Sequence, residues 1–208
     1  MAFINLSRKY VFLATARAAS TSLYDTLEYI SKSNKELFIT HRKELPDLYH
    51  IGLREFIKNY PQFRDFYIFS IVRDPYTRLV SSWNEFRDIG KHVGWSDGIK
   101  KCKNFYYFLD TFDKNISRFS IHFRPQYLQL NYFNKKSLNN IMYYEKIDDD
   151  FSKVMKILYG KSYHINSLCR PTAHFFYSKL IKKKILECVY KNYSQDIKNY
   201  YNNYFRYK

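Results

Sequence analysis

Glycine and proline are scarce in this chain, with five of each among 208 residues. Linkers between domains are usually rich in glycine, proline and serine, and no stretch of that composition interrupts the sequence. No segment repeats at a fixed period either. A chain of this length can bury a sizeable hydrophobic core, so we expect one domain that spans residues 1–208.

Cysteine is equally sparse. Cys102, Cys169 and Cys188 lie far apart in the sequence, form no Cys-x-x-Cys pair and have no histidine at metal-ligand spacing. This pattern argues against a disulfide framework and against a zinc site. We therefore expect buried or incidental thiols and no metal.

Long apolar runs are absent as well. No run approaches the roughly 18 apolar residues that a membrane-spanning helix needs. The first apolar segment starts near Tyr10, which leaves no room ahead of it for the apolar stretch of a signal peptide. These absences predict a cytoplasmic protein without a membrane span.

Acidic residues are outnumbered by basic ones, with 19 Asp and Glu against 35 Lys and Arg and a net charge of +16. Such a charge attracts polyanions, which include nucleic acids, anionic membrane surfaces, and anionic cofactors or glycans. The basic residues are scattered, apart from local runs at 100–103 and 182–184, and we interpret the second run as a solvated face. No nucleic-acid-binding motif is recognisable, so we do not expect nucleic acid as the partner. A polyanion-binding protein remains the alternative class.

Two segments, residues 10–23 and 69–83, share one pattern: an apolar strand, a polar turn and a helix start. In the first turn we expect serine and threonine to cap the helix. The backbone N–H groups at such a helix start, together with the helix dipole, can hold an anion. Each turn also carries an arginine, Arg17 in the first and Arg73 in the second. Two such sites suggest a ligand with two separate phosphate groups.

The first turn is not that of a nucleoside triphosphatase. The phosphate-binding loop of those enzymes needs glycines at fixed spacing and ends in Gly-Lys-Ser/Thr. Residues 16–22 read Ala-Arg-Ala-Ala-Ser-Thr-Ser and contain neither glycine nor lysine. A kinase or a GTPase is therefore not expected.

These residues instead resemble the sulfotransferases that use 3′-phosphoadenosine 5′-phosphosulfate (PAPS), in particular the carbohydrate sulfotransferases and their bacterial and viral relatives. In that family the first loop reads Lys/Arg-x-x-Gly/Ser-Thr-Ser and wraps the 5′-phosphosulfate. The resemblance implies that the cofactor, PAPS or its product PAP, contacts Arg17, Ala18, Ala19, Ser20, Thr21 and Ser22. The family's second motif, Arg-Asp-Pro-Tyr-x-Arg-Leu-x-Ser, matches residues 73–81 without a gap and implies that Arg73 and Ser81 bind the 3′-phosphate.

Two features of the first loop depart from the family pattern. Arg17 replaces the commoner lysine, and the loop has no glycine, which reduces how closely its backbone can approach a phosphate. The missing glycine leaves a second alternative open, a PAPS-binding relative that is catalytically inactive.

Two further segments match the family in order and spacing. Residues 122–126 resemble its His-aromatic-x-Pro-Gln segment near the acceptor, which implies that His122, Arg124 and Gln126 bind the acceptor. Residues 143–151 resemble its strand, glutamate and acidic helix start. The resemblance as a whole implies transfer of a sulfuryl group from PAPS to a hydroxyl of a carbohydrate or similar acceptor, including anionic ones.

Within this interpretation Arg17 is also a catalytic residue, because it can neutralise charge on the departing 5′-phosphate. Histidine suits the general base, since its unperturbed pKa of about 6.5 lies near working pH. Of the six histidines we favour His41, which follows a predicted strand at the same sheet edge as the two turns, with His122 as its rival. We expect Asp74 and Arg78 to hold the second turn, and the turn at 170–171 is a candidate for covering the nucleotide.

The expected elements alternate along the chain. Strands are predicted at 10–14, 37–40, 67–72 and 140–144, and helices at 21–31, 53–59, 75–87, 105–112, 151–158 and 176–201. This order predicts an α/β fold, a P-loop-like three-layer arrangement with a central parallel sheet flanked by helices. Ligands bind such sheets at the carboxyl ends of the strands, where both turns fall.

Overall fold

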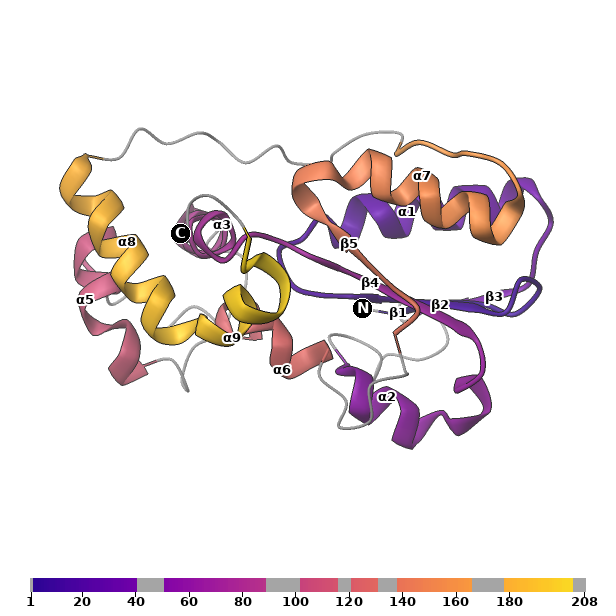
Figure 1. Ribbon diagram of the computed structural model, residues 1–208, viewed down its shortest axis with the longest axis horizontal. Coiled ribbons are helices and arrows are strands. Elements are labelled where there is room, and N and C mark those ends of the chain that lie inside the picture. Colours follow the sequence, from indigo (N-terminus) through magenta and orange to yellow (C-terminus); the bar gives the residue numbers. More distant parts are fainter. Residues whose placement is uncertain are drawn as a thin grey trace. The chain divides into compact units, whose positions relative to one another are not determined.

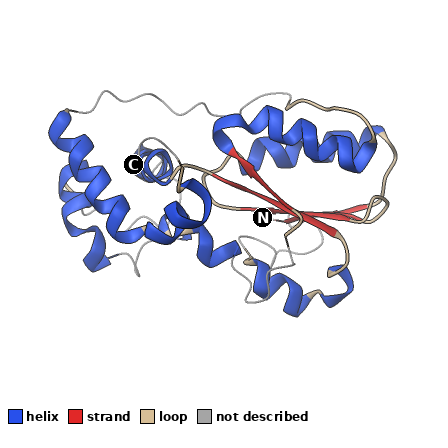
Figure 2. Cartoon of the chain, in the orientation of Figure 1, coloured by secondary structure: helices blue, strands red, loops and turns tan. Residues whose placement is uncertain are grey.

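The computed structural model of the chain describes residues 2–40, 51–88, 102–115, 121–130, 138–165 and 178–203. The chain forms two compact units (Figures 1 and 2). The first, which we call the sheet unit, comprises Met1–Arg73 and Leu128–Pro171, and the second, the helical unit, comprises Asp74–Tyr127 and Thr172–Lys208. The expectation of a single domain over residues 1–208 stays a prediction.

The sheet unit contains a five-stranded sheet with the strand order β3-β1-β2-β4-β5. The strands are β1 (Ala2–Asn5), β2 (Tyr10–Ala14), β3 (Phe38–Thr40), β4 (Tyr67–Val72) and β5 (Asn140–Tyr143). Strands β2, β4 and β5 pair in parallel, whereas β1 is antiparallel to both β2 and β3. Strand β3 therefore runs in the same direction as β2, and β1 alone is reversed. The predicted α/β fold is confirmed, and the reversed strand is a feature that the sequence analysis missed.

Helices cover both faces of this sheet, which makes three layers (Figure 1). Side chains of a strand alternate between its faces. Phe12 and Phe69 pack with residues of α1 (Ser20–Ser33) and α7 (Ile147–Tyr159), whereas Leu13 and Ile68 pack with residues of α2 (Leu53–Asn59). Because both faces are covered, β2 and β4 are almost wholly buried and are nearly continuous apolar runs in the sequence.

Local sequence explains where α7 begins and ends. Its first turn carries three aspartates, Asp148, Asp149 and Asp150, which favour the positive end of the helix dipole. It ends at Gly160, whose φ of 72° is the left-handed conformation that glycine adopts without strain. Short helical turns flank these elements at η2 (Pro61–Phe63) and η4 (Tyr144–Lys146).

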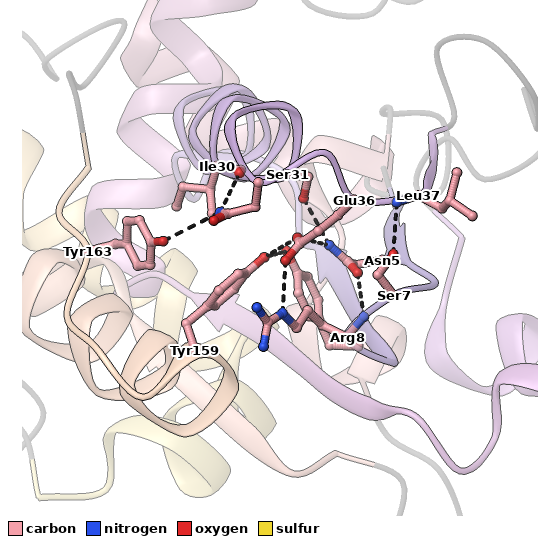
Figure 3. A network of polar contacts seen from close by, with 11 residues as sticks. Asn5, Ser7, Arg8, Ile30, Ser31, Glu36, Leu37, Tyr159 and Tyr163 are labelled. Atoms are coloured by element: carbon pink, nitrogen blue, oxygen red, sulfur yellow. Dashed lines mark hydrogen bonds and ion pairs between the residues drawn. The ribbon is translucent and has the colours of Figure 1, made fainter.

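A polar network lies at the end of the sheet opposite the two turns (Figure 3). The carboxylate of Glu36 accepts hydrogen bonds from Asn5 Nδ2 at 2.7 Å, Arg8 Nε at 2.8 Å and the Tyr159 hydroxyl at 2.7 Å. Burial alone would raise the pKa of Glu36, but these hydrogen bonds outweigh it and hold the pKa below the ordinary value of 4.5. The network joins the β1–β2 turn to the end of α7.

The helical unit has an aromatic core. Its helices are α3 (Pro75–Asp88), α5 (Phe105–Asn115), η3 (Ile121–Phe123), α8 (Lys179–Asn192), α9 (Ser194–Asp196) and the π-helix η5 (Ile197–Tyr201), while α6 (Gln126–Leu130) spans the boundary between the units. Ring centroids of Trp83 and Phe108 lie 4.8 Å apart, and those of Phe108 and Phe123 lie 5.5 Å apart. The stretch 176–201, predicted as one long or broken helix, is broken at Tyr193. No helix in the described ranges is long and apolar enough to cross a membrane.

Candidate active site

The turn between β2 and α1 has an unusual backbone. Arg17 has a φ of 63° and Ala19 a φ of 55°, both in the left-handed region that favours glycine. For residues with a Cβ atom this conformation costs about 1–2 kcal/mol each. Ala16 and Ala18 are buried on the sheet and hold the turn in place. Strained backbone of this kind concentrates at functional sites.

Side-chain hydrogen bonds fix the ends of β2 and β4 to each other. The Thr15 hydroxyl donates to the carbonyl of Ile71, and the Ser70 hydroxyl donates to the carbonyl of Leu13, each at 2.5 Å. All four positions are buried. The first turn and the end of β4, from which Arg73 follows, are therefore rigidly connected.

Helix α1 begins without a side-chain cap. Its N-cap residue is Ala19, whose methyl side chain cannot accept a hydrogen bond from the first turn of the helix. The prediction that serine and threonine cap this helix is therefore wrong: Ser20 and Ser22 are buried, and Thr21 is exposed. The first N–H groups of a helix have no acceptor within the helix, and residues 15–22 contain no acidic side chain. This helix start therefore suits an external anion.

Arg73 is the second cation of this region. Its side chain is almost fully buried, with 4% exposed. Its Nη1 donates to the carbonyl oxygen of Arg17 at 3.1 Å, and its guanidinium lies 4.2 Å from the centroid of the Tyr144 ring. The sequence analysis quoted Tyr144 in a motif without giving it a role. Tyr144 directly follows a strand that pairs with β4, and this position is the signal that could have indicated a role beside Arg73.

The second turn differs from the first. Asp74 is buried, and its Oδ1 accepts the backbone N–H of Thr77 at 2.8 Å. A carboxylate therefore accepts one N–H group at the start of α3, as expected for a residue that holds the turn. The anion site predicted at this helix start stays a prediction, in which Arg73 and Ser81 supply the side-chain contacts. Ser81 is buried in α3 and belongs to the helical unit, so its part in one site with Arg73 stays a prediction.

The predicted acceptor segment is held by its backbone. The carbonyl of His122 accepts from Arg78 Nη1 at 3.2 Å and from the Ser82 hydroxyl at 3.0 Å. The carbonyl of Phe123 accepts from the Tyr193 hydroxyl at 2.7 Å. Of the three candidate residues, His122 is half-buried, Arg124 is exposed and Gln126 is fully buried. His122 and Arg124 therefore reach the surface, and Gln126 does not.

A buried ion pair supports this segment. Arg78 Nη2 lies 3.5 Å from Asp196 Oδ2, and both side chains are at most 1% exposed. The Asp196 carboxylate also accepts the backbone N–H groups of Gln126 at 2.9 Å and Tyr127 at 2.8 Å. Burial raises the pKa of Asp196, against the lowering effects of Arg78 and these N–H groups. Arg78 therefore holds the segment 122–127 through Asp196 and the His122 carbonyl, and its predicted part in holding the second turn stays a prediction. No sequence signal pointed to Asp196.

Two sequence predictions lie outside the described residues. These are His41, our favoured general base, and the turn at 170–171. Strand β3 does end at Thr40, and its direction places that end at the same edge of the sheet as the ends of β2 and β4. Among the residues whose placement is described, no group of three or more His, Cys, Asp or Glu side chains is arranged to hold a metal ion.

An α/β sheet with an uncapped helix start and two arginines at the carboxyl ends of its parallel strands is typical of proteins that bind phosphate-bearing ligands. The sequence model of the sulfotransferase family matches residues 2–202, which include parts of both units. The chain therefore belongs to the sulfotransferase family, whose members transfer a sulfuryl group to a hydroxyl-bearing acceptor. No curated protein and no solved structure matches it.

Proposed function

We propose that this sulfotransferase takes its sulfuryl group from PAPS and transfers it to a hydroxyl of a carbohydrate-type acceptor. The observation that carries the proposal is the hydrogen bond from Arg73 Nη1 to the carbonyl of Arg17. It brings the Arg73 side chain to the backbone of a motif 56 residues away, at one edge of the sheet, which supports a single site for both motifs. A ligand with phosphate groups at both its 3′ and 5′ positions needs such a pair of cationic contacts.

The residues present fit this ligand. The start of α1 lacks a side-chain cap and an acidic neighbour, so its N–H groups would bind the 5′-phosphosulfate together with Ser20, Thr21 and Ser22. Arg73 would bind the 3′-phosphate, since a buried guanidinium fixed in orientation loses little entropy when it binds. We propose that Ser81 joins it there. When bound, PAPS supplies a sulfuryl group that is already activated by its phosphate leaving group.

The chain's own contribution is then positioning and charge. Sulfuryl transfer resembles phosphoryl transfer, in which fixed cations stabilise the charge of the transition state. Arg17 brings a permanent positive charge to the turn, and its backbone is held by Arg73. A histidine ring nitrogen would take the proton of the acceptor hydroxyl, and His41 and His122 remain the two candidates. The location of this enzyme in the cytoplasm stays a prediction.

Calorimetric titration with PAP, AMP and ATP tests the nucleotide part of the proposal. We expect one-to-one binding of PAP that is tighter than binding of AMP, because only PAP carries a 3′-phosphate. In Arg73→Ala the preference for PAP should disappear, whereas Arg64→Ala, which removes an exposed arginine of the same unit, should retain it. Absence of a preference in the unmodified protein would contradict the proposal and favour a general polyanion-binding role.

Transfer itself is tested with PAPS carrying labelled sulfur and a panel of carbohydrate acceptors. Appearance of label in a glycan, dependent on Arg17, supports the full proposal. Binding of PAP without transfer to carbohydrates, phenols or alcohols would instead identify an inactive nucleotide-binding relative, for which the glycine-free turn is the structural argument.

A further inference from the structure

The segment 121–127 is fixed at both of its ends within the helical unit. At one end, the carbonyls of His122 and Phe123 accept hydrogen bonds from Arg78, Ser82 and Tyr193. At the other end, the N–H groups of Gln126 and Tyr127 donate to Asp196. The partners come from α3 and from the α8–α9 region, far from the segment in sequence.

One guanidinium joins the two ends. Arg78 Nη1 donates to the carbonyl of His122 at 3.2 Å, while Nη2 faces Asp196 Oδ2 at 3.5 Å. The same guanidinium lies 5.0 Å from the centroid of the Tyr193 ring, which limits its movement. A displacement of Arg78 or Asp196 would therefore be transmitted to both ends of the segment.

The carboxylate of Asp196 fixes both the position and the orientation of the backbone at Gln126 and Tyr127. Its Oδ2 accepts from Gln126 and its Oδ1 from Tyr127, so neighbouring N–H groups are held by different oxygens of one rigid group. Desolvation of such an ion pair largely offsets its attraction, and apolar residues of similar volume often stabilise a core equally well. Stability alone therefore does not explain why Arg78 and Asp196 form a fully buried pair here. The pair is explained by the backbone segment that it holds in place.

We propose that Arg78 and Asp196 are positioning residues for the acceptor. They hold residues 122–127 so that Arg124, the only exposed residue of 121–127, and the half-buried His122 meet the acceptor in a fixed geometry. This inference rests on the proposed function, because it takes these residues as the acceptor-binding segment. It assigns the pair no contact with the nucleotide, so acceptor binding and nucleotide binding should separate in variants.

The test uses Asp196→Asn in the full chain. In asparagine an NH2 donor replaces one of the two carboxylate oxygens, so one of the two N–H groups loses its acceptor. We therefore expect amide hydrogen exchange at Gln126 or Tyr127 to quicken by about tenfold or more. A loosened segment should raise KM for the acceptor by about tenfold to 100-fold, since misplacement by about 1 Å has effects of that size. The acceptor probe is whichever 4-nitrophenyl β-glycoside of a panel the unmodified enzyme turns over fastest. The Kd for PAP should stay within about twofold of its original value, because the pair does not bind nucleotide.

Two further variants keep the test decisive. Asp110→Asn removes an exposed carboxylate of the same unit, one that pairs with Lys184, and should change neither exchange nor KM. If Asp196→Asn fails to fold, Tyr193→Phe replaces it: the ring over Arg78 is retained, the hydrogen bond to the carbonyl of Phe123 is lost, and KM should rise in the same direction.

The outcomes separate the two proposals. Unchanged exchange at Gln126 and Tyr127, or an unchanged KM in a variant that exchanges faster, overturns the positioning role and leaves PAPS-dependent transfer intact. An unmodified protein that neither binds PAP nor transfers sulfate overturns the proposed function, and the acceptor role of the segment falls with it.

Discussion

The guanidinium of Arg73 stacks on the ring of Tyr144, 4.2 Å from its centroid, while its Nη1 donates to the carbonyl of Arg17. These contacts fix the orientation of a buried cation. A cation that is already oriented loses less conformational entropy on binding, which is the physical meaning of preorganisation.

Tyr144→Leu should weaken PAP binding. A cation–π contact contributes about 0.5–2 kcal/mol, so we expect Kd to rise by about twofold to 30-fold. Tyr144→Phe retains the ring and should bind PAP normally. The matched control is Tyr143→Leu, which removes a neighbouring ring that lies 5.0 Å from Lys146 Nζ. Calorimetric titration measures all three variants, and equal losses in Tyr144→Leu and Tyr143→Leu would refute the specific role of Tyr144.

Arg17→Ala should slow the chemical step much more than it weakens binding. Loss of one preorganised donor costs about 2–3 kcal/mol of transition-state stabilisation, which lowers the rate by about 30-fold to 150-fold. Arg17→Lys keeps the positive charge and should recover part of that rate. Single-turnover kinetics with labelled PAPS measure the step directly. Near-normal turnover in Arg17→Ala would remove Arg17 from catalysis.

Ala19→Gly should stabilise the protein. The φ of 55° at Ala19 strains a residue with a Cβ atom, and glycine relieves the strain while it adds freedom to the unfolded chain. The balance predicts a gain of about 0.5–1 kcal/mol in the free energy of unfolding. Ala18→Gly is the matched comparison and should lower the free energy of unfolding, because it removes a fully buried methyl group at a position without a positive φ. Chemical denaturation measures both, and destabilisation in Ala19→Gly would contradict the strained turn.

Glu36 should make stability depend on pH in the acidic range. Its pKa is lower in the folded protein than its ordinary value of 4.5, so its stabilising contribution is complete above that pH and disappears as the pH falls through the folded pKa. Glu36→Gln should lower the free energy of unfolding by about 1–2 kcal/mol at neutral pH. The difference from the unmodified protein should shrink below pH 4.5.

The control for this prediction is Glu28→Gln, which removes a surface ion pair with Lys32 on α1. Pairs of this kind contribute only about 0.3–0.5 kcal/mol. The lowered pKa of Asp148, caused mainly by its hydrogen bond with His164, also affects the acid limb of the unmodified protein. The free energy of unfolding is therefore measured against pH for both proteins. The difference between the unmodified protein and Glu36→Gln isolates the contribution of Glu36. A constant difference from pH 7 to pH 3 would contradict the assignment.

The elements best predicted from sequence are those with a single strong local signal. Strand β4 has the predicted bounds, because its apolar run ends at a polar turn followed by Pro75. Helix α2 matches its predicted bounds as well. Strand β1 was missed since four residues are too few to show a period, and their partners, β2 and β3, are set only by tertiary folding.

The residues of the candidate site likewise include some that the sequence indicated and some that it did not. The motifs drew attention to Arg17 and Arg73, and the structure places the Arg73 side chain against the backbone of Arg17. They did not predict Asp196, because the partners of its carboxylate are backbone N–H groups 69 and 70 residues away, and a backbone contact leaves no trace in side-chain pattern. Nor did they predict the strain at Ala19, because nothing in the sequence of the turn distinguishes a left-handed alanine from an ordinary one.

The order of the strands also constrains how this chain is completed during synthesis. Strands β4 and β5 are hydrogen-bonded neighbours, yet residues 74–127 of the helical unit are translated between them. A nascent chain that stops short of Asn140 would thus present β4 as an open edge, with unpaired N–H and carbonyl groups beside an apolar surface. Such edges promote aggregation. Once β5 is made, the edge of the sheet is this shorter and less apolar strand, and the long apolar β4 is covered.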